Sequence, residues 1–349
     1  MALIDFAHFP GRYHMRILVT GAAGFIGAAL IERLLARGEH VLGVDNHNDY
    51  YDPALKQARL DRFAAHPGYR HARLDIADGA AVREAFAQFR PERVVHLAAQ
   101  AGVRHSLTNP GAYVQSNLVG FGNMLEACRH GAVQHLVFAS SSSVYGANRK
   151  LPFSEADAVD HPVSLYAATK KSNELMAHAY SHLYRLPATG LRFFTVYGPW
   201  GRPDMSPILF ARRIQRGEPL QVFNHGRHQR DFTYIDDIVE GVLAVLDRPA
   251  APDPAYDPLH PHPARSDAPF HIYNIGGDAP VELLRFIELL ERALGRTVEK
   301  HLLPMQPGDV EATWADVSAL RTATGWQPRV GIEDGIARFV RWFSGYYGA

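Results

Sequence analysis

The 349 residues of this chain include 36 basic and 36 acidic side chains, so no net charge favours a general attraction to nucleic acid or to an anionic membrane. With 47% hydrophobic and 21% charged residues, the chain has the composition of a globular protein with a sizeable core. Its one cysteine, Cys128, excludes an intramolecular disulfide and fits a reducing compartment. Residues 1–14 lack the apolar core of a signal peptide, and no long apolar run follows. We therefore expect a cytoplasmic protein whose partner is a small molecule.

Residues 1–14 are expected to form an N-terminal extension, because Met15 stands directly before the first strand-like run. From there, short apolar runs alternate with helical patterns; the runs lie at 17–19, 41–44, 94–97, 136–138 and 191–194. Such alternation predicts an α/β fold with a doubly wound parallel sheet and helices on both faces. Gly38 is placed to end the first helix, and Asn109-Pro110 to begin a long one.

Beyond about residue 198 the pattern breaks into smaller pieces, with helices expected at 207–216, 235–246, 281–294 and 332–346. We expect residues 15–197 to form mainly a cofactor-binding domain. Residues 198–349 should form mainly a smaller α/β substrate-binding domain, with some exchange of chain between the two. Residues 248–269 are dense in proline, alanine and aspartate and predict a surface loop.

A glycine turn, Gly21-x-x-Gly24-x-x-Gly27, follows the first run and opens a helix. Its backbone amides could approach a pyrophosphate, although the spacing differs by one residue from the commonest fingerprint and a purely structural turn is the alternative. Asp45 ends the next run, 18 residues after Gly27, where a carboxylate can accept hydrogen bonds from the adenosine ribose. That carboxylate would repel a 2′-phosphate and no arginine follows until Arg59, so NAD is favoured over NADP. Asp75, after the third run, would lie beside the adenine or serve as a helix N-cap.

Tyr166 and Lys170 stand four residues apart in a helical pattern and so share one face. A nearby ammonium should lower the pKa of the phenol from about 10 toward neutrality and make it a usable general base at an alcohol. Taken alone the spacing is common, and an exposed aromatic beside a solvated lysine is the alternative.

Five features occur in the order typical of the extended short-chain dehydrogenase/reductase family, also described as NAD-dependent epimerases and dehydratases: the glycine turn, Leu97-Ala98-Ala99, Asn117, Ser140–Gly146 and Tyr166-x-x-x-Lys170. The chain resembles this family from Met15 onward. The resemblance implies a Rossmann-like domain, a tightly held NAD, a nucleotide-sugar substrate and no metal. It implies catalytic roles for Ser141, Tyr166 and Lys170, although Ser141 could also be a buried strand-end hydroxyl. The implied cofactor contacts are Gly21, Gly24, Phe25, Ile26, Gly27, Asp45, Asn46, Asp75, Ile76, Leu97, Ala98, Ala99, Gln100, Asn117, Tyr166, Lys170 and Phe193.

Within that family the chain is most similar to the UDP-glucuronate 4-epimerases. The similarity lies in residues 46–53, 100–104, 195–205 and 306–309. It implies that UDP lies against the second domain, with Arg230 at the diphosphate and Gln221 and Asp309 at the uridine. Surface or structural ion-pair roles remain open for these three residues.

Such an enzyme would oxidise the sugar C4 hydroxyl, let the ketone turn over, and reduce it from the other face. A C4 ketone makes the C6 carboxylate a β-keto acid, which loses CO₂ readily. Arg202 could clamp that carboxylate with two charge-assisted hydrogen bonds, helped by hydroxyls of Ser142, Ser143 and Thr195. The alternative for Arg202 is a solvated side chain in a glycine- and proline-containing loop.

Rival functions fail on particular residues. Dehydratases of the family carry an Asp-Glu pair, and decarboxylases a glutamate, at positions that are Ser142 and Ser143 here. A UDP-glucose 4-epimerase remains the best enzymatic alternative, and Arg202 argues against it. A non-catalytic NAD-binding protein would not need Ser141, Tyr166 and Lys170. The resemblance also implies a homodimer formed by two long helices from each subunit.

Overall fold

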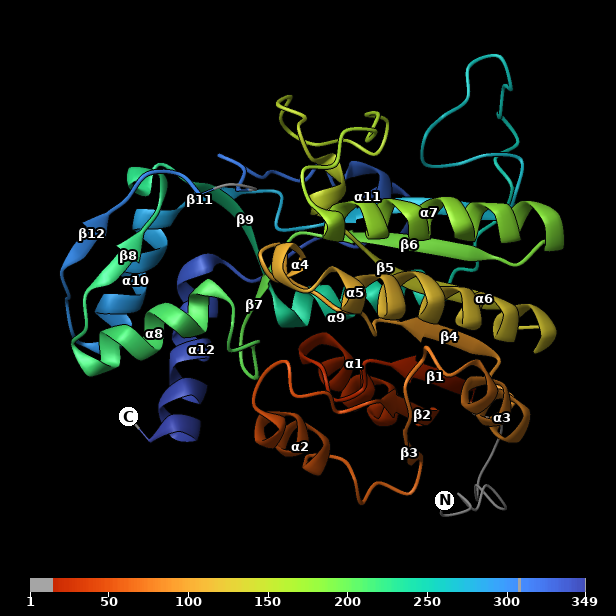
Figure 1. Ribbon diagram of the computed structural model, residues 1–349, viewed down its shortest axis with the longest axis horizontal. Coiled ribbons are helices and arrows are strands. Elements are labelled where there is room, and N and C mark those ends of the chain that lie inside the picture. The colour runs from red at the N-terminus through yellow and green to blue at the C-terminus, as the bar shows by residue number, and fades with distance from the viewer. Residues whose placement is uncertain (1–14, 307–308, 349) are drawn as a thin grey trace.

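The computed structural model describes residues 15–306 and 309–348, so the expected N-terminal extension lies outside the described part. Its main feature is a seven-stranded sheet whose strand pairs are all parallel, in the order β10-β6-β5-β4-β1-β2-β3 (Figure 1). The strands are β1 (Arg16–Thr20), β2 (His40–Asp45), β3 (Tyr69–Arg73), β4 (Arg93–His96), β5 (His135–Ser141), β6 (Ala188–Phe193) and β10 (Phe270–Ile275). Except for the added β10, this is the order of a doubly wound dinucleotide-binding sheet, and it confirms the expected fold.

Helices cover both faces because successive strand residues point to opposite sides. In β1, Ile17 and Val19 join the core beneath α1 and α9, whereas Leu18 joins the core beneath α3 and α6. On the second face α6 and α7 run side by side (Figure 1). The helices packed on the sheet are α1 (Phe25–Ala36), α3 (Gly79–Phe89), α6 (Gly120–His130), α7 (Leu165–Tyr184), α9 (Ile235–Leu246) and α11 (Ser318–Thr324). Cys128 lies buried in the second core.

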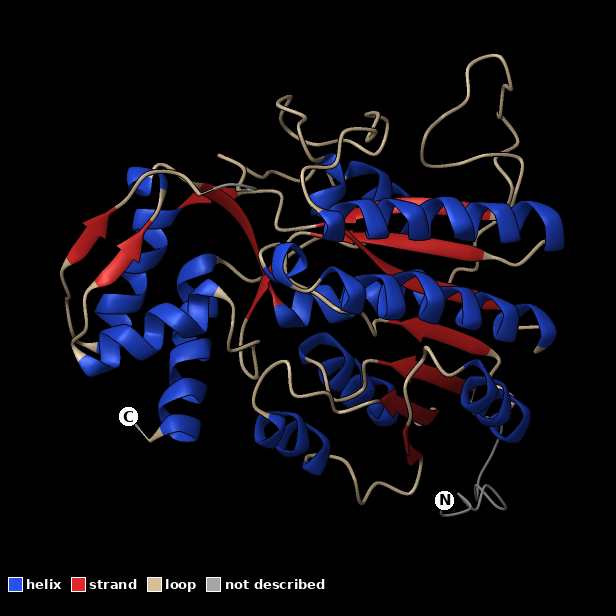
Figure 2. Cartoon of the chain, in the orientation of Figure 1, coloured by secondary structure: helices blue, strands red, loops and turns tan. Residues whose placement is uncertain are grey.

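A smaller α/β unit stands beside the carboxyl ends of the parallel strands, at the left of Figure 2. Its strands are β7 (Thr195–Tyr197), β8 (Leu220–Val222), β9 (Gln229–Tyr234), β11 (Pro280–Glu282) and β12 (Lys300–Leu302). Its helices are α8 (Ser206–Arg216), α10 (Leu283–Leu294) and α12 (Ile332–Tyr347). The chain returns to the seven-stranded sheet after residue 198: β10 is one of its strands, and α9 and α11 pack against it.

Most expected boundaries are confirmed, with two differences. Residues 281 and 282 were expected to open a helix but pair with β9 as part of β11, so α10 begins at Leu283. The long helix after Asn109 starts at Pro110 as expected, but no side-chain hydrogen bond from Asn109 caps it. It runs as α5 (Pro110–Tyr113), a π-helix (Val114–Val119) and α6.

Loops and helix ends also follow the sequence signals. Gly38 has a φ of +82°, directly after the first helix and its C-cap, as a terminating glycine should. Residues 248–269 contain no helix and no strand and are mainly exposed, which confirms the predicted surface loop. Within residues 15–306 and 309–348, no helix combines the length and apolar character needed to cross a membrane.

Candidate active site

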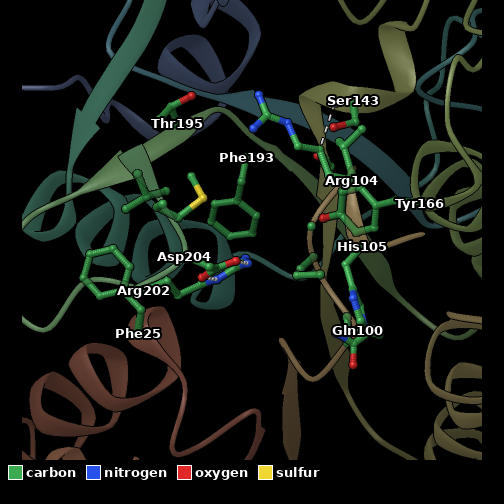
Figure 3. Close-up of a pocket in the computed structure, with 18 of the residues that line it drawn as sticks. Phe25, Gln100, Arg104, His105, Ser143, Tyr166, Phe193, Thr195, Arg202 and Asp204 are labelled. Atoms are coloured by element: carbon green, nitrogen blue, oxygen red, sulfur yellow. Dashed lines mark hydrogen bonds and ion pairs between the residues drawn. The ribbon is translucent and has the colours of Figure 1, made fainter. Parts of the chain in front are cut away.

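A cavity of about 900 Å³ lies between the carboxyl ends of β1, β2, β4, β5 and β6 and the smaller unit. In an open parallel sheet, ligands bind at the point where the strand order reverses, which here lies between β1 and β4. Every residue that the sequence predicted for the site lines this cavity except Asn117. Arg202 and Asp204 meet within it, and Tyr166 and Ser143 lie across from them in Figure 3.

The glycine turn packs so tightly against neighbouring backbone that side chains at Gly21 and Gly27 would not fit. Gly21 has a φ of +74°, and a Cβ there would come within 2.9 Å of the Ala98 backbone nitrogen. A Cβ at Gly27 would collide with the Gly21 carbonyl oxygen. In the described part of the chain, no side chain caps α1 at its N-cap, Gly24. The backbone amides at the N-terminus of α1 therefore fit a dinucleotide pyrophosphate.

Acidic side chains hold the loops on the nucleoside side. Asp45, at the end of β2, accepts hydrogen bonds from the backbone nitrogens of Ala23 (3.0 Å) and His47 (2.8 Å). It thereby ties the glycine turn to the next loop and still lines the cavity. Asp75 accepts a hydrogen bond from the Asn46 side-chain amide (3.0 Å). The N-cap alternative for Asp75 is wrong, because Asp78 caps α3.

Asn117 stands apart from the other predicted site residues. It lies in the π-helix, is buried, and does not line the cavity. Its side chain accepts a hydrogen bond from the Gln100 backbone nitrogen (2.9 Å) and donates to the Gln100 carbonyl oxygen (3.0 Å) and to Thr169 Oγ1 (3.0 Å). Asn117 thus fixes the loop after β4 against α7, and its direct contact with the cofactor stays a prediction.

The helix α7 carries Tyr166 and Lys170 into the cavity. It begins after Ser164, whose hydroxyl accepts a hydrogen bond from the Ala167 backbone nitrogen (3.1 Å). Lys170 is buried, its Nζ donates to the Ala139 carbonyl oxygen (2.8 Å), and burial lowers its pKa to about 8. An ammonium has three donors, so Lys170 can make two further hydrogen bonds.

The prediction that the pKa of Tyr166 lies below its ordinary value is wrong, and Lys170 is not among the groups that lower it. Burial raises the pKa of the Tyr166 phenol above its ordinary value, since desolvation disfavours the phenolate. The Ser141 hydroxyl and the Arg202 charge act in the opposite direction and lower the pKa of Tyr166. The positive charge that lowers the pKa of Tyr166 is therefore that of Arg202, in the loop after β7. Lys170 donates its hydrogen bond to Ala139 instead.

A buried ion pair holds β6, the end of β5 and α7 together beside the cavity. Arg192 on β6 binds the Glu174 carboxylate on α7 through two nitrogens, at 2.8 and 2.9 Å. Ser140 donates to the same carboxylate (2.6 Å), and Tyr145 accepts a hydrogen bond from Arg192 (3.1 Å). This network fixes the serine run at the end of β5 against the helix that carries Tyr166. Ser142 and Ser143 lie in the short 3₁₀ turn that follows Ser141.

Arg202 lies in the loop between β7 and α8 and is paired within that loop. Its Nε donates to Asp204 Oδ1 (3.1 Å) and its Nη2 to Asp204 Oδ2. The Tyr50 hydroxyl donates to the same Asp204 oxygen (3.1 Å). Sequence reasoning missed Asp204 and Tyr50 as site residues, although both stand in the segments that carry the family resemblance. The signal was available: an acid two residues after an arginine can reach it.

A second arginine, Arg59 on α2 (Pro53–Asp61), is fully buried beneath this loop. It donates to the carbonyl oxygens of Ala23 (2.9 Å), Trp200 (2.7 and 3.0 Å) and Gly201 (2.9 Å). One guanidinium therefore joins the glycine turn to the backbone directly before Arg202.

The opposite end of the cavity is built by the smaller unit. Gln221 lies on β8, Arg230 on β9 and Asp309 in the segment after β12. Arg230 donates to the Glu311 carbonyl oxygen (3.0 Å). Asp309 forms an ion pair with Arg104 (3.2 Å), which also lines the cavity and was not singled out from the sequence.

Comparison with known proteins agrees with this geometry. The model of the NAD dependent epimerase/dehydratase family matches residues 17–276. A protein of Rhizobium meliloti named as a probable UDP-glucuronate 4-epimerase is 49% identical over 339 residues, which cover 95% of this chain and 98% of that protein.

Two solved structures have the same fold. UDP-glucuronic acid 4-epimerase from Bacillus cereus, in complex with UDP-glucuronic acid and NAD, gives a TM-score of 0.86 at 33% identity and covers 95% of this chain and 100% of its own. UDP-glucose 4-epimerase from Thermotoga maritima, with UDP-glucose, gives 0.83 at 29% identity with the same coverage. From the matched segment and these relatives, the chain belongs to the NAD dependent epimerase/dehydratase family.

Proposed function

We propose that the chain catalyses the NAD-dependent C4 epimerisation of a UDP-hexuronic acid, between UDP-glucuronate and UDP-galacturonate. The observation that carries the proposal is the presence of an arginine, Arg202, in the same cavity as Ser141, Tyr166 and Lys170. The names of the relatives from Rhizobium meliloti and Bacillus cereus support it.

The cofactor would lie along the glycine turn, with its adenosine at Asp45, Asn46, Asp75 and Ile76. The fit rests on the glycine cradle and on the uncapped N-terminus of α1. Residues 97–100 and Phe193 would line the rest of its path. NAD, when bound, supplies reversible hydride transfer at the sugar carbon.

Tyr166 would take the proton from the C4 hydroxyl and return it after the sugar has turned over. Arg202 and Ser141 both act to lower the pKa of this phenol, so they favour the phenolate that the step requires. Ser141 would also donate a hydrogen bond to the C4 oxygen. Lys170 has two donors left, which fit the phenolate and a ribose hydroxyl.

The carboxylate of the substrate would lie between Arg202 and the hydroxyls of Ser142, Ser143 and Thr195. A β-keto acid loses CO₂ when its carboxylate bond stands perpendicular to the carbonyl plane. Several charge-assisted hydrogen bonds would hinder that conformation and keep the ketone intact until reduction. UDP would extend toward Gln221, Arg230 and Asp309 in the smaller unit.

A UDP-glucose 4-epimerase is the second candidate. Asp204 already accepts hydrogen bonds from Arg202, and the UDP-glucose 4-epimerase from Thermotoga maritima has the same fold. Incubation with UDP-glucuronate, followed by proton NMR, separates the possibilities. We expect a mixture of UDP-glucuronate and UDP-galacturonate. Conversion of UDP-glucose without conversion of the acid would overturn the proposal, and a UDP-pentose product would indicate a decarboxylase.

We further propose that two chains form a dimer through α6 and α7, and that the protein works in the cytoplasm. Leu175 and Leu183 on α7 are 60% and 66% exposed and lie eight residues apart, on one face of the helix. Val114 and Val119, in the π-helix before α6, are also exposed. The buried, unpaired thiol of Cys128 fits a reducing compartment.

The double variant Leu175→Arg, Leu183→Arg should be a monomer in light scattering, because two charges would be buried without partners at such an interface. Leu259→Arg is the control, since Leu259 is 83% exposed in the loop at 248–269. A monomeric unmodified protein, or a double variant that remains dimeric, would exclude this interface.

A further inference from the structure

The side chain of Asp204 binds one particular edge of Arg202. Its two oxygens accept from Nε and Nη2, which together form the lateral edge of the guanidinium. The terminal edge, formed by Nη1 and the second proton of Nη2, makes no hydrogen bond to Asp204. A guanidinium has five donors in a fixed fork, so a carboxylate on the lateral edge fixes the plane in which the terminal edge points.

Asp204 is itself held from outside its loop. The Tyr50 hydroxyl donates to its Oδ2 (3.1 Å), and burial together with the Asp204 charge keeps the pKa of Tyr50 above its ordinary value, so the phenol remains a donor. The Tyr50 ring contacts His105, with 4.7 Å between ring centroids. A series of side-chain contacts therefore runs from His105 through Tyr50 and Asp204 to Arg202, and it joins the loops of the large sheet to the loop after β7.

The backbone of the same loop is fixed separately. Arg59 binds the carbonyl oxygens of Trp200 and Gly201, directly before Arg202. With the backbone held from below and the side chain held at its lateral edge, Arg202 has little freedom to rotate. Its charge nevertheless reaches Tyr166, whose pKa it lowers.

We propose that Asp204, supported by Tyr50, is a positioning residue that aims the terminal edge of Arg202 at the substrate carboxylate and so sets the preference for an acidic sugar. The inference rests on the proposed function, because it needs a substrate that carries a carboxylate. Asp204 does not touch the substrate: it acts through Arg202. Its charge is needed for orientation, since an amide would keep the shape but present one acceptor and one donor to a partner that only donates.

The test is Asp204→Asn in the full chain with bound NAD, with Tyr50→Phe as the second variant. Isothermal titration with UDP-glucuronate and with UDP separates the acid-dependent part of binding, because UDP has no sugar carboxylate. We expect Asp204→Asn to weaken UDP-glucuronate binding about tenfold, because a loosely held guanidinium loses part of its charge-assisted hydrogen bonding to the carboxylate. UDP binding should stay within about twofold of the unmodified protein. Tyr50→Phe should show the same pattern with a smaller loss.

Product analysis gives an independent readout. A loosely held Arg202 should allow part of the keto acid to decarboxylate, so the UDP-pentose fraction should rise in both variants. Glu288→Gln is the matched control, because Glu288 also binds arginines but is exposed on α10, outside the cavity. It should change neither binding nor products.

Three results would overturn the inference. Tighter binding of UDP-glucuronate by Asp204→Asn would make Asp204 a competitor of the substrate carboxylate. Unchanged binding would leave Asp204 without effect on recognition, and an equal loss for UDP would mean a general structural role. Failure of the proposed function itself is recognised separately, by the absence of UDP-galacturonate from reactions of the unmodified protein.

Discussion

Tyr166→Phe is expected to lower the rate of epimerisation by roughly 10²- to 10⁴-fold, the range attributed to a positioned general acid–base group. The variant loses one oxygen atom and keeps the ring, which contacts Tyr113 edge to face with 6.1 Å between centroids. The nicotinamide cofactor should therefore stay bound. Turnover is measured by proton NMR on UDP-glucuronate, and the bound cofactor by its absorbance after the protein is denatured.

Tyr256→Phe is the matched control, since it makes the same chemical change in the surface loop at 248–269. It should turn over at the unmodified rate. If Tyr166→Phe kept more than about a tenth of the activity, the proton would have to pass through another group. Loss of the cofactor together with activity would point to a disturbed site.

Arg202→Ala should produce the second large change. A charge-assisted hydrogen bond contributes about 1.5–3 kcal/mol, so the loss of the clamp should lower kcat/KM for UDP-glucuronate by at least the value of one such bond, about 10- to 150-fold. Because the carboxylate would then rotate more freely, UDP-pentose should appear among the products. NMR resolves the anomeric protons of the pentose and hexuronate products and gives both quantities at once.

Arg202→Lys is the informative companion, because it keeps the charge and loses the planar fork. We expect it to recover part of the affinity while still releasing some UDP-pentose. Clean epimerisation by Arg202→Ala at the unmodified rate would remove Arg202 from carboxylate recognition.

The positions of several predicted site residues follow strand ends in recognisable patterns, while the role of Ser141 was implied by the family resemblance. Gly21, Asp45 and Ser141 each stand at or after the carboxyl end of a parallel strand, and such ends meet at one edge of a sheet. The spacing of Tyr166 and Lys170 is local to one helix. These positions needed no knowledge of distant contacts, and the cavity contains all of them.

What failed depended on distant parts of the chain. The pKa of Tyr166 is set by burial and by Arg202, 36 positions later in the sequence, which a helical spacing cannot reveal. Asn117 bonds Gln100 and Thr169, contacts that its place in the sequence does not reveal. Asp204 was missed because its importance comes from the arginine it binds and from Tyr50 on a separate loop.

The second half of the chain was harder for a related reason. Residues 281 and 282 were expected to belong to the helix that follows, but β9 offers them a strand partner. Periodicity describes one segment, whereas strand pairing depends on a neighbour that the segment itself does not specify.

The return of β10 to the large sheet has a consequence for synthesis on the ribosome. When residue 197 emerges, the outer edge of β6 has no strand beside it, and the surface of α1 that packs on α9 is uncovered. Residues 235–246 later cover α1, and residues 270–275 complete the edge beside β6. The nascent cofactor-binding half therefore presents an open strand edge and apolar surface, the features that recruit chaperones, until residue 275 has been translated.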